Sequence, residues 1–288
     1  MKLFTEIQTE KDPRFKVGLE DSITLLGSCF SDNIAARLSD GGFTLCRNPF
    51  GTLYNPASIA AAVSRLDSGE PFVESDCVQM GAGSPLVCSF SHHTSFARPT
   101  AGEFLSNANA RLAEASKFWK ESSVAVLTLG TAFVWRVLSR GGEVASNCLK
   151  RPSAEFSREL LSVGQCESLI EGIIERHPGK RFILTVSPIR HLADGAHANT
   201  VSKSTLHLAV DSVLSRHGNV RYFPAYEILL DELRDYRFYD RDLVHPRDIA
   251  VDILWERFLE TFVPDKDKAG VRANEKSAAR SRHKPILV

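Results

Sequence analysis

Residues 22–38 constrain the fold most, because a short apolar run passes directly into an amphipathic helical pattern. The run Ile23-Thr-Leu-Leu26 is typical of a strand that is buried on both faces, and Ser31-Asp-Asn33 offers N-cap side chains to the helix that follows. Gly27 and Ser28 then lie at the carboxyl end of the strand, where open α/β sheets bind their ligands. A hydroxyl held there, beside the N–H groups of a helix start, has the surroundings of a nucleophile.

A second stretch, Asp240-Arg-Asp-Leu-Val-His-Pro246, supplies side chains that complete such a site. Asp242 and His245 are three residues apart, so one helical turn or tight loop can hold the imidazole beside the carboxylate. With Ser28 they form a predicted set of nucleophile, general base and orienting acid.

Two other residues are rivals for these roles. His191 follows a predicted strand and is an alternative general base, ranked below His245. Cys29 adjoins Ser28 and is an alternative nucleophile, but alternation along an extended strand end turns its side chain away from that of Ser28. The sequence therefore favours packing as the role of Cys29.

Several short motifs, in order along the chain, carry a resemblance to a known family. They are Gly27-Ser-Cys-Phe-Ser31, Asn48-Pro-Phe-Gly-Thr-Leu-Tyr-Asn-Pro56, Ser91-His-His93, Leu129-Gly-Thr-Ala-Phe133, Ser146-Asn-Cys148, Thr185-Val-Ser-Pro-Ile-Arg-His191, Tyr222-Phe-Pro-Ala-Tyr-Glu227 and Asp235-Tyr-Arg-Phe-Tyr239. Over most of residues 20–262 the chain resembles the GSCFA family, which is grouped with the SGNH (GDSL-like) hydrolases. The resemblance implies a three-layer α/β/α fold and a Ser-His-Asp esterase or acyl-transfer site at Ser28, Asp242 and His245.

The chain departs from the wider superfamily at the group that stabilises an oxyanion. The superfamily's third block has an Asn two residues after a Gly, whereas Gly130 here is followed by Thr, Ala and Phe. Either other groups do this work or the oxyanion hole is incomplete. The candidates are the side chains or backbone N–H groups of Asn48, Gly51, Asn147 and Ser28.

Four further residues are substrate candidates because they follow predicted strands, open the next helix or lie in a long loop. Gly130 ends a strand close to the predicted crevice. Arg190, or Lys203 in the next helix, offers a cation for an anionic substrate group, against the alternatives of a salt bridge and a solvated lysine. His93 lies in the loop at 68–100, and because His92 and His93 are adjacent they cannot share a metal, so no metal site is expected.

Alternating strand and helix patterns predict the architecture. Apolar runs near residues 23, 43, 124, 182 and 220 predict a five-stranded parallel sheet in one three-layer α/β/α domain. Residues 1–20 are expected to be a lead-in, 21–263 the domain with an insertion near 68–100, and 264–288 a disordered basic tail. The apolar spacing at 155–177 predicts a helix that breaks at Gly164.

Composition excludes several classes of partner. Positive and negative residues number 35 each, so no net charge attracts nucleic acid or an anionic membrane. The N-terminus lacks the apolar stretch of a secretory signal, and no run is long enough to span a bilayer, so the expected compartment is the cytoplasm. Six cysteines without metal-type spacing are expected to be reduced thiols, and no cofactor is indicated.

These observations lead to three functional hypotheses. The first is a serine esterase or acyltransferase that acts on small acyl esters, with carbohydrate esters suggested by the superfamily resemblance. The second is a catalytically degraded module that binds a glycan or another small ligand, which the missing third-block Asn favours. The third is a thiol enzyme that uses Cys29.

Overall fold

Five parallel strands form the central sheet of the computed structural model, which describes residues 5–282. The strands are β1 (Ser22–Gly27), β2 (Thr44–Arg47), β5 (Val124–Leu129), β9 (Arg181–Val186) and β10 (Val220–Tyr222). Their order in the sheet is β10-β9-β5-β1-β2, and every neighbouring pair is parallel. The chain therefore leaves β1 towards one edge of the sheet to form β2 and then crosses to the other side to form β5. This reversal makes the carboxyl ends of β1 and β5 the switch point at which such sheets bind ligands.

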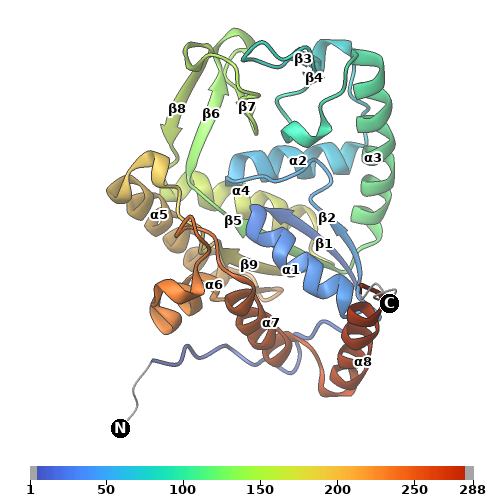
Figure 1. The fold of residues 1–288 in the computed structure, drawn as a ribbon, viewed down its shortest axis with the longest axis vertical. Coiled ribbons are helices and arrows are strands. Elements are labelled where there is room, and N and C mark those ends of the chain that lie inside the picture. Colours follow the sequence, from blue (N-terminus) through green and yellow to red (C-terminus); the bar gives the residue numbers. More distant parts are fainter. Residues whose placement is uncertain (1–4, 283–288) are drawn as a thin grey trace, which may run out of the picture.

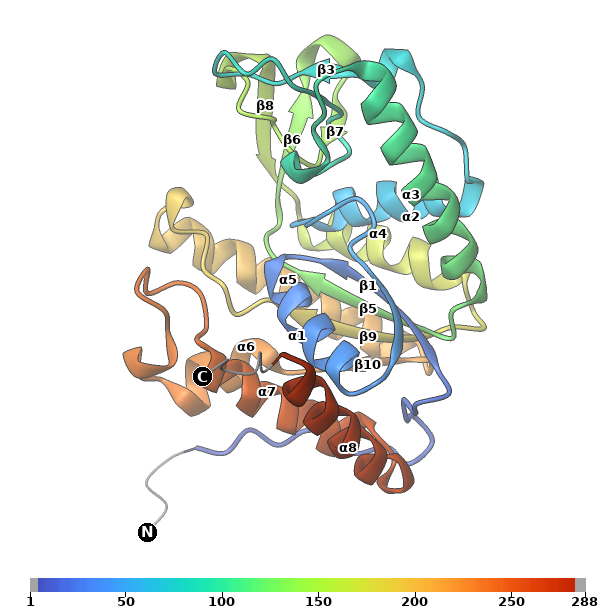
Figure 2. The ribbon, with the colours of Figure 1, turned by 45° about the vertical axis from the view of Figure 1, so that its right-hand side comes forward.

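Helices cover both faces of this sheet, so the predicted three-layer α/β/α fold is confirmed (Figures 1 and 2). One face packs against α2 (Pro56–Ser68), α3 (Ala101–Glu121), α4 (Val163–Arg176) and α5 (Ala196–Arg216). The other packs against α1 (Cys29–Asp40), α7 (Asp248–Phe262) and α8 (Asp265–Arg282). A short helix, α6 (Ala225–Glu227), continues into a π-helical segment, Ile228–Leu233. Among residues 5–282, no helix combines the length and the apolar character required to cross a bilayer.

Two small antiparallel sheets extend the core beyond α2 and α3. The hairpin of β3 (Val78–Gln79) and β4 (Val87–Cys88) lies within the predicted insertion. The second sheet has the order β7-β6-β8 and consists of β6 (Phe133–Val137), β7 (Glu143–Ala145) and β8 (Phe156–Leu160). The helix predicted over 155–177 is thus wrong at its start, because residues 156–160 pair with β6 and place Phe156 in the core.

The two ends of the described chain lie on the face that α1 and α7 cover. Residues 5–21 contain no helix or strand, but Phe15 and Val17 are buried there. The prediction of a disordered tail is wrong for residues 265–282, which form α8, while 283–288 lie outside the described residues. Val271 buries its side chain, and Asn274 Nδ2 donates to the carbonyl of Gly41, 2.9 Å away, at the end of α1. One buried apolar residue, together with polar contacts such as those of Asn274 and Glu275, anchors this otherwise polar helix.

Substitution of Val271 by Ala should therefore lower the free energy of unfolding by about 2 kcal/mol, because it removes buried methyl groups and leaves a cavity. Urea denaturation followed by circular dichroism measures this change. Lys276→Ala, on the exposed side of the same helix, is the matched control and should change stability by less than about 0.5 kcal/mol. Equal effects of the two substitutions would show that α8 does not pack on the domain.

Candidate active site

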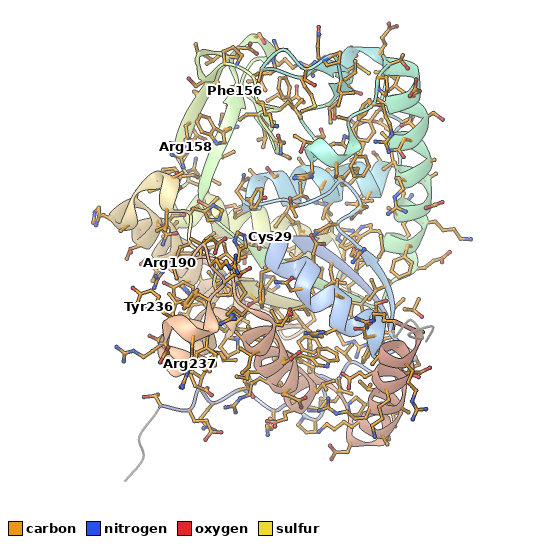
Figure 3. The ribbon with its side chains drawn as sticks, viewed as in Figure 1. Cys29, Phe156, Arg158, Arg190, Tyr236 and Arg237 are labelled. Carbon is orange, nitrogen blue, oxygen red and sulfur yellow. The ribbon has the colours of Figure 1, made fainter. Side chains whose placement is uncertain are left out.

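The site begins at the junction of β1 and α1, where the chain turns from strand to helix within one residue. Ser28 is the N-cap of α1 with an extended backbone (φ −68°, ψ 173°), and Cys29 is the first helical residue. The helix thus starts earlier than the Ser31-Asp-Asn33 predicted as its cap. Strand alternation does not apply to Cys29, because it already lies in the first helical turn. Figure 3 shows Cys29 at this start of α1.

A closed loop holds the second part of the site. Tyr239 and Pro246 form an antiparallel bridge, and the N–H of Asp240 donates to the carbonyl of His245, 2.8 Å away. Within the loop, Asp242 Oδ1 accepts from the N–H groups of Val244 and His245, each at 2.9 Å. Asp242 Oδ2 lies 2.6 Å from His245 Nδ1. The carboxylate therefore fixes both the backbone of the loop and the orientation of the imidazole.

The two parts meet at Cys29 and not at Ser28. Cys29 Sγ lies 3.7 Å from His245 Nε2, although the two residues are 216 positions apart in the chain. Ser28 is 1% exposed, and its Oγ has no hydrogen-bond partner among the described residues. The structure therefore places the imidazole beside the thiol of Cys29, whereas the hydroxyl of Ser28 is buried and makes no hydrogen bond among the described residues.

Ionisation of the Asp242 carboxyl determines which nitrogen of the His245 imidazole carries the proton. The N–H groups of His245 and Val244, together with the imidazole, lower the pKa of the Asp242 carboxyl to about 2. The ionised carboxylate only accepts, so in the neutral form of the imidazole the proton lies on Nδ1 and is donated to Asp242. Nε2 is then a free acceptor directed at the Cys29 thiol, which is the arrangement of a general base.

The thiol itself resists ionisation. Cys29 is half-buried, and burial, followed by the nearby carboxylate of Asp32, raises the pKa of its thiol. The N–H groups of Cys29 and Phe30 act in the opposite direction and lower this pKa. At neutral pH Cys29 is therefore a thiol that needs a base, in contrast to the preformed thiolate of many reactive cysteines.

Most of the predicted oxyanion donors are already occupied. Gly51 N–H donates to the carbonyl of Asn48 at 2.7 Å, and Ser28 N–H donates to the carbonyl of Thr128 at 3.2 Å. The Asn48 carboxamide accepts from Gly27 N–H and donates to Asp32, both at 2.9 Å. Asn147 Oδ1 accepts from the N–H of Leu149 in the turn after β7. Their hydrogen bonds hold the backbone and side chains of these residues in place. The first two N–H groups of α1, at Cys29 and Phe30, face the Cys29 sulfur and lower the pKa of its thiol.

Gly130, directly after β5, lies close to three groups of the site. A Cβ atom here would lie 2.9 Å from the carbonyl of Tyr54, 3.3 Å from His191 Nε2 and 3.5 Å from Ser28 Cβ. Its N–H donates to the carbonyl of Tyr54 at 2.8 Å. Gly130 is thus a position of close approach and offers no free donor.

Lys203 and His191 lie beneath and beside the reactive pair. Lys203 is 2% exposed, and its Nζ donates to the carbonyls of Gly130 and Ser187, each at 2.6 Å. It is therefore not a solvated lysine, and burial lowers its pKa to about 7. His191 stacks edge-on against Tyr54, its Nε2 has no partner among the described residues, and burial lowers its pKa to about 4. His191 is therefore neutral at pH 7, and no described contact joins it to Ser28 or Cys29.

The other substrate candidates lie outside the contacts of this pair. His93 Nδ1 lies 3.1 Å from Ser95 Oγ, in the loop before α3. Arg190 is half-buried, and its charge acts on Tyr226 and Tyr239. Within residues 5–282, no group of three or more His, Cys, Asp or Glu side chains is placed to hold a metal ion.

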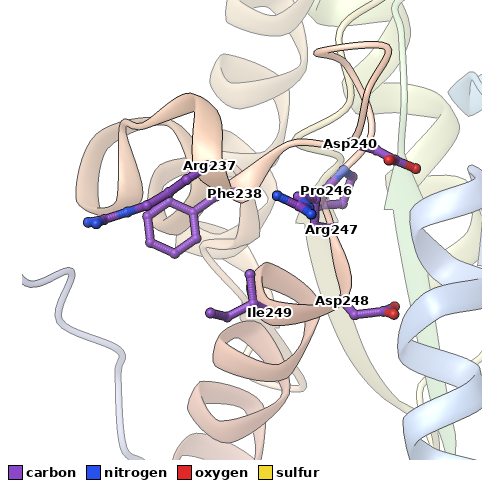
Figure 4. Close-up of a pocket in the computed structure, with 7 residues that line it drawn as sticks. All are labelled: Arg237, Phe238, Asp240, Pro246, Arg247, Asp248 and Ile249. Carbon is purple, nitrogen blue, oxygen red and sulfur yellow. The ribbon is translucent and has the colours of Figure 1, made fainter.

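A pocket of about 740 Å³ lies next to the loop that carries Asp242 and His245 (Figure 4). Arg237, Phe238, Asp240 and Arg247 contribute to its wall, with the guanidinium of Arg237 5.0 Å from the centre of the Phe238 ring. Neither Asp242 nor His245 lines it. This pocket therefore lies against residues that flank the loop, and the side chains of Asp242 and His245 do not open into it.

The fold and this site define an α/β protein in which a thiol, an imidazole and a carboxylate lie in line at the sheet's switch point. The GSCFA family model matches residues 22–258, so the chain belongs to the GSCFA family. No curated protein matches it significantly.

Solved structures with a similar fold include several esterases, all at low sequence identity. An alpha/beta hydrolase enzyme from the metagenome of Lake Arreo, Spain, is 10% identical, with a TM-score of 0.44 over 85% of this chain and 96% of that one. A family 3 carbohydrate esterase from Clostridium thermocellum is 11% identical, with a TM-score of 0.40 over 88% and 98%. A catalytic mutant of an acetylxylan esterase from Geobacillus stearothermophilus is 9% identical, with a TM-score of 0.44 over 85% and 95%.

Because the Asp32 carboxylate raises the pKa of the Cys29 thiol, Asp32→Asn should lower that pKa and speed alkylation at neutral pH. The pH dependence of iodoacetamide modification, followed by mass spectrometry of the Cys29 peptide, measures the change. Asp40→Asn, at the far end of the same helix, is the control and should leave the alkylation curve unchanged. A curve that moves to higher pH in Asp32→Asn would contradict this electrostatic assignment.

Proposed function

We propose that this protein is an esterase or acyltransferase whose nucleophile is Cys29, with His245 as general base and Asp242 as the orienting acid. The observation that carries this proposal is the contact of 3.7 Å between Cys29 Sγ and His245 Nε2, with Asp242 Oδ2 2.6 Å from the other ring nitrogen. The order of thiol, imidazole and carboxylate is that of nucleophilic acyl transfer.

The acylation step follows from this geometry. As Cys29 Sγ attacks the ester carbonyl carbon, its proton passes to His245 Nε2, and the carbonyl oxygen becomes an oxyanion. The N–H groups of Cys29 and Phe30 at the start of α1 stabilise that oxyanion. Its collapse breaks the bond to the alkoxy oxygen, which takes the proton from His245 and leaves as an alcohol. A thioester on Cys29 remains.

Deacylation uses the same base. Water or an acceptor hydroxyl gives a proton to His245 Nε2 as its oxygen attacks the thioester carbonyl, and the thiolate leaves and recovers that proton. Water gives hydrolysis, and an alcohol gives transfer. Half the side-chain surface of His245 (48%) is exposed, so either acceptor reaches the imidazole from solvent.

The substrate belongs to the class of small acyl esters. Carbohydrate esters are the first to test, since the superfamily that the GSCFA family resembles includes hydrolases of such esters. The sealed hydroxyl of Ser28 supports a thiol mechanism over the serine mechanism expected from the sequence.

Cys29→Ala should abolish hydrolysis of 4-nitrophenyl acetate, whereas Ser28→Ala should retain most of it, because only the thiol contacts the base. Mass spectrometry of the intact protein and its peptides should find the acetyl group on Cys29. Cys46→Ala, at another half-buried cysteine, is the matched control. Loss of activity in folded Ser28→Ala, with activity kept in Cys29→Ala, would establish the serine mechanism instead. A folded wild-type protein that is never acylated would favour a binding module.

Asp242→Asn should lower kcat/KM by about 10²- to 10⁴-fold, because a carboxamide can donate to Nδ1 and so place the imidazole proton on Nε2, where it faces the thiol. Steady-state hydrolysis of the same ester measures this loss. The control is Asp240→Asn, since that exposed carboxylate lies in the same loop and, among the residues that the structure describes, its side chain accepts only from the N–H of Arg241. Similar losses in both variants would mean that loop structure, and not the imidazole tautomer, sets the rate.

A further inference from the structure

A basic cleft lies one helical turn from the proposed nucleophile. It has a volume of about 600 Å³, and its wall includes Asp32, Arg47, Thr52, His93, Arg98 and Arg111, which we call the arginine cleft. These residues come from α1, the end of β2 and its following loop, the loop before α3, and α3 itself. The edge strand β2 contacts both α1 and α3, which cover opposite faces of the sheet.

The positive charge of the cleft is poorly compensated. Within residues 5–282, Arg47 is exposed and makes no ion pair. Arg98 Nη1 donates to the carbonyls of residues 95, 96 and 97, at 3.2, 3.2 and 2.9 Å, which fixes the side chain without neutralising it. Arg111 pairs with Glu114 at 3.3 Å, but both side chains are more than half exposed, so this pair is weak.

One carboxylate, that of Asp32, lies on the wall of this cleft, and it is already held by another residue. Asn48 Nδ2 donates to Asp32 Oδ1 at 2.9 Å. Asp32 lies three residues after Cys29 in α1, so the two side chains share a face of the helix. On the wall of the cleft, the Asp32 carboxylate is thus the group nearest to Cys29 along α1. The three guanidinium groups, those of Arg47, Arg98 and Arg111, come from other elements.

A second connection joins the cleft to the site. Thr52 Oγ1 lies 3.3 Å from the hydroxyl of Tyr54, and the Tyr54 ring packs edge-on against His191. The carbonyl of Tyr54 also accepts from the N–H of Gly130 on the floor of the site. The cleft thus adjoins the reactive cysteine along α1, and residues 52–54 connect the cleft to Gly130 and His191.

We propose that the arginine cleft binds an anionic oxygen group, a carboxylate or a phosphate, on the ester that acylates Cys29. Guanidinium groups are the side chains best suited to such groups, because their fork matches two oxygens. The cleft begins at Asp32, one helical turn (~5.4 Å along the axis) after Cys29, so an anion beside the guanidinium groups lies more than one turn from the scissile carbonyl and needs a substrate with a chain between the two groups. This inference rests on the proposed function for the identity of the reacting atom, but the anion site itself does not require catalysis.

Direct binding tests the site without any turnover. Inorganic phosphate, titrated into the full-length Cys29→Ala protein by isothermal titration calorimetry or NMR, should bind in the millimolar range. Binding should weaken by about tenfold or more in a variant that also carries Arg47→Gln and Arg111→Gln. The control carries Lys117→Gln and Lys120→Gln, which remove two charges from α3 at positions outside the cleft. This control should bind phosphate as tightly as the Cys29→Ala protein does. Absence of phosphate binding, or equal weakening in both variants, would overturn the proposal.

A pair of esters tests the link to specificity. The hydrogen adipate and hexanoate esters of 4-nitrophenol have the same acyl chain length and differ in a terminal carboxylate. The wild-type ratio of kcat/KM should favour the adipate ester by about tenfold, and the preference should disappear in the Arg47→Gln/Arg111→Gln variant and at high salt. If the Arg47→Gln/Arg111→Gln variant kept the wild-type preference for the adipate ester, the role of the cleft would be overturned. Arginine-dependent phosphate binding in a protein that hydrolyses neither ester would support the anion site while rejecting the proposed function.

Discussion

The register between β1 and β5 is the constraint on which the site depends. A Cβ atom on Gly27, whose φ is 151°, would lie 2.3 Å from the carbonyl oxygen of Thr128, so the two chains approach as closely as only glycine permits. The next N–H, that of Ser28, donates to the same carbonyl and extends the ladder beyond the strand. Asn48 secures Gly27 from the other side. These contacts hold the backbone rigidly up to Ser28. They therefore also fix the position of Cys29, the first residue of α1.

The reactive groups differ sharply in how they meet solvent. Asp242 is exposed and is held ionised by N–H donors of its own loop, whereas the Cys29 thiol is half-buried and is held protonated. His245 spans the boundary, with one nitrogen on the carboxylate and the other on the thiol. A thiol that ionises only as a base removes its proton is protected from oxidants and alkylating agents that attack thiolates. The burial of Cys29 therefore favours selectivity over general reactivity.

The sequence predicted the architecture well because parallel strands buried on both faces leave a clear signal. Ile23 to Leu26 and Val124 to Leu129 are such runs, and both are strands. It also predicted the pairing of Asp242 with His245, since a three-residue spacing is a local property. It did not predict the contact of Cys29 with His245, because one residue decides whether the chain is still a strand or already a helix, and Ser28 is the N-cap where Ser31 to Asn33 were expected.

Two other failures arose from tertiary contacts that no local pattern records. The stretch at 156–160 pairs with β6, which lies far outside any window of helical periodicity. Lys203 was expected in solvent, yet it lies on the same stripe of α5 as the buried Leu206 and Val210. That stripe was a usable signal, because a lysine three residues before a buried leucine on a helix faces the core. Its two carbonyl acceptors belong to the ends of β5 and β9, and only the folded sheet brings them together.

The burial of Lys203 links folding to proton release near neutrality. Its pKa falls from 10.5 to about 7, so between these values the unfolded chain binds a proton that the folded chain has lost. This residue therefore makes the native state more stable as the medium becomes alkaline, and least stable where the ammonium is fully charged. Within residues 5–282 no carboxylate pairs with Lys203, so its ammonium supplies positive potential beside Cys29, and it does so most strongly in mildly acidic surroundings, where the ammonium is fully charged.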